Sequence, residues 1–410
     1  MEQHPEHTWG HTLPFGEEYY QKITELLRKI QVDAGVFAQV ANKATEALRT
    51  GHKVYTDAAI GHMPPEEMAD EREGNPAQIH CCGHGCSAED YAALAAGDVL
   101  VTNSVNEAVR QVRDAGVYVV GLPTAYINNS TTPPGKVHPN QNDWLLEDVC
   151  TLVIDTYIPW NQGIVRVPQV PEMPLFPSSS NITCAIHWML TAEVARSLAT
   201  GEKADGTAGR EYLDILLARL DDVHRVDLPG LNEQAVVVAK RIIAGGRFFV
   251  RSRNGGVQGD ANGVAQGLML TNAFEMRAAA EGGDGDTLVL AAVSADDPQE
   301  LAWAQQGRAN GNYIMGIGPV DSPQLRQACD VYFDNGCVEA AGVIEVPGMD
   351  EKICPATGIL NNIILQILTA QFTDEMCRRG AVPYCWKGGY WVGGMDYNNV
   401  VGPSMRERGY

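Results

Sequence analysis

Hydrophobic positions along the chain switch between helical and strand-like spacing, and the same order of segments occurs twice. Residues 19–50 carry apolar side chains at helical spacing, Gly51 ends the predicted helix, and a short apolar strand follows at 54–60. Later, residues 231–244 again form a helical pattern that ends at glycine, before a strand at 247–251. The pattern predicts two successive units that each begin with a helix and a strand.

Three further pairs of short apolar strands continue this correspondence. Each strand is separated from the next by a helical or polar segment, which is typical of a mostly parallel sheet covered by helices on both faces. The pairs are 97–101 with 285–290, 117–121 with 312–316, and 152–155 with 331–334.

Two long helical segments give the most specific match. Residues 177–192 and 355–370 align without a gap, because Pro177 and Pro355 are 178 positions apart and so are Leu190 and Leu368. We therefore predict a duplication. The alternative is one large α/β domain whose buried strands look alike for a common physical reason.

The predicted fold class is α/β, with two tandem domains that are each a flavodoxin-like, three-layer arrangement of parallel sheet and helices. The boundaries are an N-terminal extension at 1–17, a first domain at 18–203 and a second domain at 210–410. Residues 201–209, which are small and polar, form the expected linker. A length of 410 residues agrees with two domains, because single hydrophobic cores stop growing below this size.

Composition narrows the function classes. The net charge of −21 would repel a polyanion, so nucleic acid is not an expected partner. No run of 18 apolar residues occurs, and residues 1–15 lack the basic and apolar regions of a signal peptide, so we expect a soluble, cytoplasmic protein without a membrane partner. The 10 cysteines are scattered, as reduced structural thiols are, except for the group at 81–86.

Several motifs together resemble the double SIS (sugar isomerase) domain family. Gly97-Asp-Val-Leu-Val-Thr-Asn-Ser104 is similar to the family's strand and phosphate loop, and Phe176-Pro-Ser-Ser-Ser180 to its Gly-Pro-Thr-Ser-Thr turn. Gly393-Gly-Met-Asp-Tyr-Asn398, with residues 406–410, is similar to the C-terminal signature of the phosphoheptose-isomerase-like branch. The resemblance covers about residues 18–410 and implies a sugar or sugar phosphate as ligand.

The chain also departs from the family pattern. The Ser-x-Ser-Gly loop is Thr102-Asn-Ser-Val105 in the first half, without the glycine. In the second half it is Ala292-Val-Ser-Ala295, followed by Asp296 and Asp297. Two carboxylates would oppose a phosphate dianion, so we expect the two halves to differ in function.

Two polar segments are candidates for binding a phosphate or another anionic group. Short polar loops at helix N-termini supply several converging donors. The alternative for both segments is N-capping of the following helix, which needs a single hydroxyl. The candidate residues are Thr102, Asn103, Ser104, Ser178, Ser179 and Ser180.

The segment after the first strand is the candidate for catalysis. If a helix begins at Pro65, Glu67 and Glu71 are four residues apart and share a face. Aldose–ketose isomerisation needs a base that moves a proton between adjacent carbons. The family resemblance implies that Glu67 is this base and that His62 opens the sugar ring or binds substrate. The alternative is a solvated acidic helix start that the helix dipole stabilises, as expected for Glu66 and Glu73.

A dense group of histidines and cysteines, His80-Cys-Cys-Gly-His-Gly-Cys86, is the candidate for metal binding. Thiolates and imidazoles suit zinc or another divalent metal, and the predicted ligands are His80, Cys82, His84 and Cys86. His138 or His187 could complete the site, although a buried structural role is the favoured interpretation of His187. The alternative is that Cys81 and Cys82 pack in the core while His80 and His84 line a sugar pocket. No other cofactor is required, because the glycine-rich stretch at 254–259 lacks a dinucleotide fingerprint.

The sequence thus predicts an aldose–ketose isomerase acting on a sugar or sugar phosphate. Two alternatives stay open: a non-catalytic, regulatory protein that senses a sugar phosphate, and a lyase that eliminates from sugar ethers on the same fold. A homo-oligomer, at least a dimer, is expected because such assemblies are common among these folds.

Overall fold

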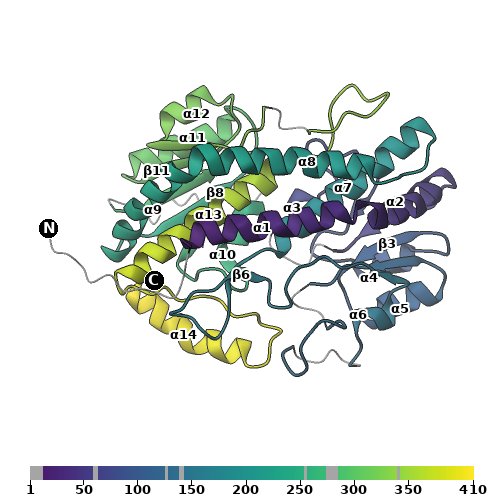
Figure 1. The fold of residues 1–410 in the computed structure, drawn as a ribbon, viewed down its shortest axis with the longest axis horizontal. Coiled ribbons are helices and arrows are strands. Elements are labelled where there is room, and N and C mark those ends of the chain that lie inside the picture. The colour runs from purple at the N-terminus through teal and green to yellow at the C-terminus, as the bar shows by residue number, and fades with distance from the viewer. Residues whose placement is uncertain are drawn as a thin grey trace.

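The computed structural model describes residues 13–58, 63–124, 128–137, 143–253, 256–273, 285–338 and 342–410. Within these ranges the chain forms two five-stranded, all-parallel sheets, one from each half (Figure 1). This confirms the predicted α/β fold class. The first sheet has the order β2 (His80–Cys81), β1 (Val54–Thr56), β3 (Val99–Thr102), β4 (Tyr118–Gly121), β5 (Leu152–Val153). The second has the order β9 (Thr271–Ala273), β8 (Phe248–Ser252), β10 (Thr287–Ala291), β11 (Tyr313–Gly318), β12 (Val331–Asp334).

Both sheets therefore have the strand order 2-1-3-4-5 when the strands of each half are counted from its start. The central strands β3 and β10 are buried at every position, as expected for parallel strands covered on both faces. A duplicated chain would produce this identity of order, and the duplication and its boundaries stay a prediction.

The predicted helix at 19–50 is two helices, α1 (Phe15–Val32) and α2 (Ala34–Arg49). They meet at Asp33, whose φ of −87° and ψ of 10° lie outside the helical range. Because of this break, α1 packs against a helix of the second half, α13 (Thr357–Arg378). In return, α8 (Thr207–Asp222) of the second half packs against α7 (Ser179–Thr200) of the first.

This exchange of helices places one continuous hydrophobic core between the two sheets. Outside it, α5 (Glu107–Asp114) and α6 (Leu146–Val149) cover the first sheet through residues such as Val109 and Leu146. On the far side, α11 (Pro298–Ala309) and α12 (Pro323–Ala328) cover the second sheet with Trp303 and Leu325. The two halves are thus layers around shared central helices (Figure 1).

Helices α7 and α13 are the centre of this core. They are buried around nearly their whole circumference, and they bury polar side chains such as Asn181 and Asn362 together with the apolar ones. Within the described ranges, no helix combines the length and the apolar character that a bilayer crossing needs. The remaining elements are α3 (Pro64–Glu67), α4 (Ala88–Ala93), β6 (Gly163–Val165), β7 (Leu175–Pro177), the π-helix η1 (Val223–Asp227), α9 (Leu228–Ile243), α10 (Gly256–Gly263) and α14 (Gly394–Arg408).

Candidate functional site

The order 2-1-3-4-5 reverses between β1 and β3 in the first sheet and between β8 and β10 in the second. Ligands of open α/β sheets bind at such reversals, outside the carboxyl ends of the strands. Each half therefore has one position at which a site is expected from topology.

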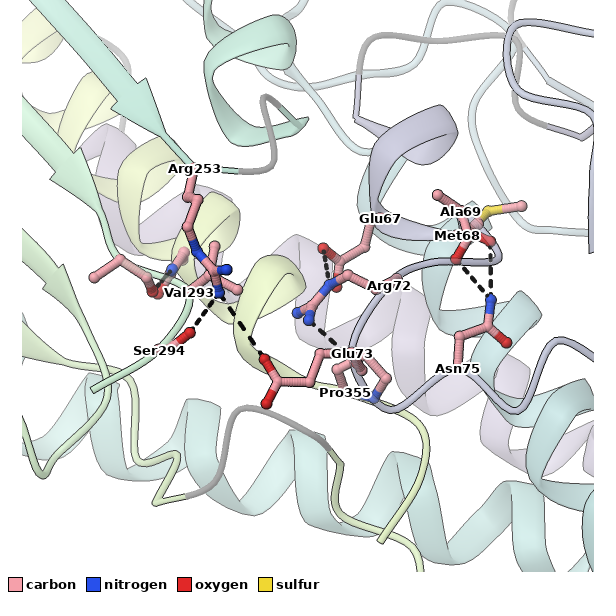
Figure 2. A network of polar contacts seen from close by, with 12 residues as sticks. Glu67, Met68, Ala69, Arg72, Glu73, Asn75, Arg253, Val293, Ser294 and Pro355 are labelled. Atoms are coloured by element: carbon pink, nitrogen blue, oxygen red, sulfur yellow. Dashed lines mark hydrogen bonds and ion pairs between the residues drawn. The ribbon is translucent and has the colours of Figure 1, made fainter. Parts of the chain in front are cut away.

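A cavity of about 280 Å³ lies at the reversal in the second sheet. Arg253 follows β8 and Val293 follows β10, and the opposite wall comes from residues 66–73 of the first half (Figure 2). The site is thus built from both halves, which the sequence did not indicate. The lining residues are Glu66, Ala69, Glu71, Arg72, Glu73, Arg253 and Val293.

The segment that closes this cavity is shaped by a short helix. Prolines open α3, which has only four residues and ends at Glu67. The side-chain amide of Asn75 donates to the carbonyls of Met68 and Ala69, at 3.2 and 2.8 Å, and so replaces the backbone N–H groups of a further turn. The expectation that Glu67 and Glu71 share a helix face is therefore wrong, because the helix ends before Glu71.

Glu67 lies behind the cavity wall in a buried ion pair. Its Oε2 accepts a hydrogen bond from Nε of Arg72 at 3.3 Å, and the two side chains are only 1% and 3% exposed. Arg72 also donates to the backbone carbonyl of Glu73 (Figure 2). Arg72 lines the cavity, and Glu67 lies behind it. Glu67 would therefore act on a ligand through the guanidinium group of Arg72. The predicted role of Glu67 as a base stays a prediction.

Glu66 is the carboxylate that sequence reasoning missed. It is half-buried and lines the cavity, where burial raises its pKa. The Nε2 of His84 lies 3.9 Å from its Oε1. A carboxyl group whose pKa is raised by burial is a stronger base than an exposed carboxylate, and a histidine beside it is a second group that can carry a proton. On sequence alone, Glu66 is expected at a solvated helix start and its neighbour Glu67 is favoured, because neither spacing nor residue type shows which of two adjacent glutamates faces a cavity.

Arg253 brings positive charge to the opposite wall. It donates to Oγ of Ser294 and lies 3.5 Å from Asp297 and 3.9 Å from Glu73. Glu300 lies 4.0 Å from Arg253, and burial raises its pKa to about 7. The guanidinium is one-third exposed and can still meet a ligand.

The two aspartates of the second loop have structural partners. Asp297 caps α11 by accepting from the backbone N–H groups of Gln299 and Glu300. Asp296 accepts from the backbone N–H groups of Gln324 and Leu325 at the start of α12. These hydrogen bonds fix both carboxylates at helix starts.

The predicted phosphate loop of the first half lies at the first reversal. Thr102, Asn103 and Ser104 are buried, and the Ser104 N–H donates to Oγ1 of Thr102 at 2.9 Å. Asp57, which follows β1, is buried beside them; burial raises its pKa, and Tyr91 donates to its Oδ2 at 2.7 Å. Sequence reasoning missed Asp57. An ionised carboxylate there would oppose a phosphate, as the second-half aspartates would.

Ser178, Ser179 and Ser180 are buried at the start of α7, and their hydroxyls have protein partners. Ser178 donates to the carbonyl of Gln162 at 3.0 Å and Ser179 to its side-chain oxygen at 2.5 Å. Ser180 donates to Oδ1 of Asp260 in the second half, also at 2.5 Å. No side-chain cap forms at Ser178, so N-capping does not explain these residues. Anion binding by them stays a prediction.

The predicted metal ligands are brought together in part. Cys82 and Cys86 form a disulfide, and both sulfurs lie within 4.8 Å of a carboxylate oxygen of Asp90. His80 instead contacts Asp70 at 2.5 Å. The sequence did not predict this disulfide. The other eight cysteines are unpaired and buried, as predicted for the seven outside the group at 81–86.

Three further histidines were candidates for the catalytic or metal site. His62 and His138 lie outside the described residues. His187 is buried within α7, where burial lowers its pKa to about 3, in agreement with a structural role.

Comparison with known proteins gives two partial sequence relatives and several similar folds. No protein-family profile matches the chain. A UPF0309 protein of Streptomyces griseus is 25% identical over 135 residues, which is 30% of this chain and 54% of that protein. One of Listeria monocytogenes is 21% identical over 165 residues, 38% of this chain and 67% of that protein. The match thus spans about half the length of the first relative.

Two solved structures share the architecture. One is the C-terminal domain of glucosamine-fructose-6-phosphate aminotransferase from Francisella tularensis, with a TM-score of 0.51 and 12% identity over 94% of this chain and 100% of that chain. The other is a protein assigned as a phosphosugar isomerase from Clostridium difficile, with a TM-score of 0.50 and 10% identity over 90% of this chain and 95% of that chain. At these identities the likeness establishes the fold: parallel α/β sheets flanked by helices.

Proposed function

We propose that the protein binds a sugar or sugar phosphate in the cavity at the second-sheet reversal and isomerises it between aldose and ketose. The observation that carries this is the cavity itself, which joins Glu66 of one half to Arg253 of the other at the strand ends. Its volume of about 280 Å³ suits a small ligand. The carboxylates of the wall at residues 66–73 and a guanidinium group on each wall can hydrogen-bond to several hydroxyl groups.

The chemistry assigns separate roles to the two walls. Glu66 is the proposed base, because it lines the cavity and burial raises its pKa, which makes its carboxylate a stronger base. Arg253 faces it and would hold an anionic group of the substrate. Glu67 would act through Arg72 by holding its guanidinium in the wall. Two proteins of the same fold are named for phosphorylated sugars, which agrees with this substrate class, although a fold alone does not fix a function.

A panel of aldoses, ketoses and their phosphates tests the proposal. We expect at least one compound to raise the melting temperature and to be converted to its isomer. With that compound, Glu66→Gln should lower kcat by about 100-fold or more with a small change in KM. Glu89→Gln, an exposed glutamate on α4, is the matched control and should keep full activity.

Other outcomes would point to a different function or a different base. A compound that raises the melting temperature but is not converted would indicate a sugar-sensing protein. Release of an eliminated acid would indicate a lyase. If Glu67→Gln abolished turnover while Glu66→Gln did not, the base would be Glu67. If no compound bound, the proposal would fail.

A further inference from the structure

The loop between β2 and α4 brings two sulfurs and a carboxylate together. Cys82 and Cys86 have Cα atoms 4.8 Å apart, and Gly83 and Gly85 between them have φ values of 61° and 123°. Such values favour glycine, and they let five residues turn back on themselves. The Sγ atoms of both cysteines and a carboxylate oxygen of Asp90 all lie within 4.8 Å of one another.

The two sulfurs are bonded to each other in the structure, so they must separate before they can take the spacing of a tetrahedral zinc site. Thiolate sulfurs at about 2.3 Å and a carboxylate oxygen at about 2.0 Å from zinc are roughly 3.3–3.8 Å from each other. The carboxylate of Asp90 is already held in place, because its Oδ2 accepts from both the N–H and the hydroxyl of Ser87 at 2.7 Å. Small movements of the side chains would therefore place three ligands around one ion.

His80 is outside this group of three, and its side chain would have to move to supply a fourth ligand. Its Nδ1 lies 2.5 Å from Oδ2 of Asp70, whose other oxygen accepts from the N–H of Cys81 at 2.9 Å. A carboxylate on one ring nitrogen is the usual support of a metal-binding histidine, because it leaves the other nitrogen with its lone pair. His80 also lies close enough to Asp90 to interact with it electrostatically.

We propose that Cys82, Cys86 and Asp90 bind one zinc-type divalent ion when the two cysteines are reduced, with Nε2 of His80 as the fourth ligand. Sulfur and imidazole ligands select such an ion over calcium or magnesium. The set differs from the one that the sequence suggested, because Asp90 replaces His84, whose imidazole lies beside Glu66.

The disulfide and the metal are alternative states of the same loop. The structure has Cys82 and Cys86 joined, and this bond must accept two electrons and two protons before metal binds. A dithiol reductant supplies both and becomes a disulfide itself. The ion then displaces the two thiol protons. A reductant can reach this disulfide, since both cysteines are partly exposed whereas the other eight are buried.

Metal titration of tag-free protein tests the site without reference to any sugar. Reduced protein should bind one zinc per chain, and protein oxidised at Cys82 and Cys86 should bind none. Cobalt in place of zinc should give the thiolate charge-transfer band and the visible bands of a tetrahedral ion. Calcium and magnesium should not compete.

Matched variants on the same loop identify the ligands. Cys82→Ser and Cys86→Ser should abolish binding, and Asp90→Asn and His80→Ala should weaken it by about tenfold or more. Glu89→Gln and His84→Ala, which change neighbouring residues of the same types, should bind as the unmodified protein does. Circular dichroism checks that each variant folds.

Two results would overturn the site. One is reduced protein that binds no zinc, and the other is binding that survives in the double variant Cys82→Ser, Cys86→Ser. If the cysteine variants fail to fold, two comparisons test the site: Asp90→Asn against Glu89→Gln, and His80→Ala against His84→Ala. Equal zinc affinity within both pairs would overturn the site. Either failure leaves the proposed sugar site unaffected.

Discussion

Glu67 of the first half lies directly against Gly358, at the start of α13 in the second half. A Cβ atom placed on Gly358 would be 2.1 Å from Oε2 of Glu67. The opposite crossing has the same form: Ser180, which corresponds to Gly358 at the 178-residue offset, donates to Asp260 after β8. In each crossing, a carboxylate that follows the first strand of one half lies against the start of the long helix of the other, by close packing at Gly358 and by a hydrogen bond at Ser180.

Gly358→Ala should be destabilising, because the added methyl group has no room beside Glu67. Overpacking of this kind costs about 1–3 kcal/mol. Urea denaturation measures the loss as a lower midpoint with an unchanged slope. Gly35→Ala is the matched control: it lies in α2 with open space around it, so it should be neutral or slightly stabilising. Equal effects of the two substitutions would show that the contact between Glu67 and Gly358 is not tight.

Removing one partner of the buried pair between Glu67 and Arg72 should be more costly. Arg72→Met leaves the Glu67 carboxylate buried without its cation, and such losses are about 3–5 kcal/mol. Lys29→Met breaks an exposed pair with Glu25 and should cost about 0–1 kcal/mol. The double variant Glu67→Met, Arg72→Met should recover much of the stability, since it removes both charges. If Arg72→Met matched Lys29→Met, the pair would not be desolvated in solution.

The strands could be predicted where each was a run of consecutive apolar residues. β3 and β10 have this pattern and lie where the sequence placed them. β2 has two residues, a histidine and a cysteine, and gives no hydrophobic signal. The break at Asp33 was missed as well, because apolar spacing continues through it and only the exchange of α1 between halves requires it.

The site was harder to predict because it depends on contacts across the chain. Arg253 lies beside residues 66–73 because the two halves exchange helices. No local sequence pattern predicts that these two segments are close together. Asp57 lies within a predicted strand, where no sequence pattern indicated a function for it. Its carboxyl group lies beside the loop at 102–104 only in the folded chain. Local patterns located the loops, but they could not show which side chains face each other.

Glu300 should make stability fall as pH rises through neutrality. Burial, with some contribution from Asp297, raises its pKa to about 7, so the folded state holds a proton that the unfolded chain releases near pH 4.5. Protonated Glu300 therefore stabilises the fold fully below about pH 4.5, and this stabilisation is lost as pH rises through about 7. The total effect is up to about 3 kcal/mol.

Glu300→Gln tests this dependence, because glutamine keeps an oxygen for the Val293 N–H, which donates to Oε1 at 2.8 Å. Free energies of unfolding between pH 5 and 8 should fall less steeply in this variant than in the unmodified protein. Glu351→Gln, an exposed glutamate, should leave the slope unchanged. A slope that is the same in all three proteins would mean that Glu300 titrates at an ordinary pH.

Arg253→Met should discriminate between phosphorylated and neutral sugars, if the cavity is the substrate site. A charge-assisted hydrogen bond contributes about 1.5–3 kcal/mol, so affinity for a sugar phosphate should fall by roughly 10- to 100-fold. The loss should be larger at low salt, since Asp297 and Glu73 would then face the anion without their cation. Affinity for the unphosphorylated sugar should change little.

Arg247→Met is the control: Arg247 precedes β8, at the opposite end of the strand, and pairs with Asp286 at 2.9 Å. Isothermal titration of both ligands against both variants measures the difference. An equal loss for the two ligands in Arg253→Met would show that Arg253 shapes the cavity and does not bind the phosphate.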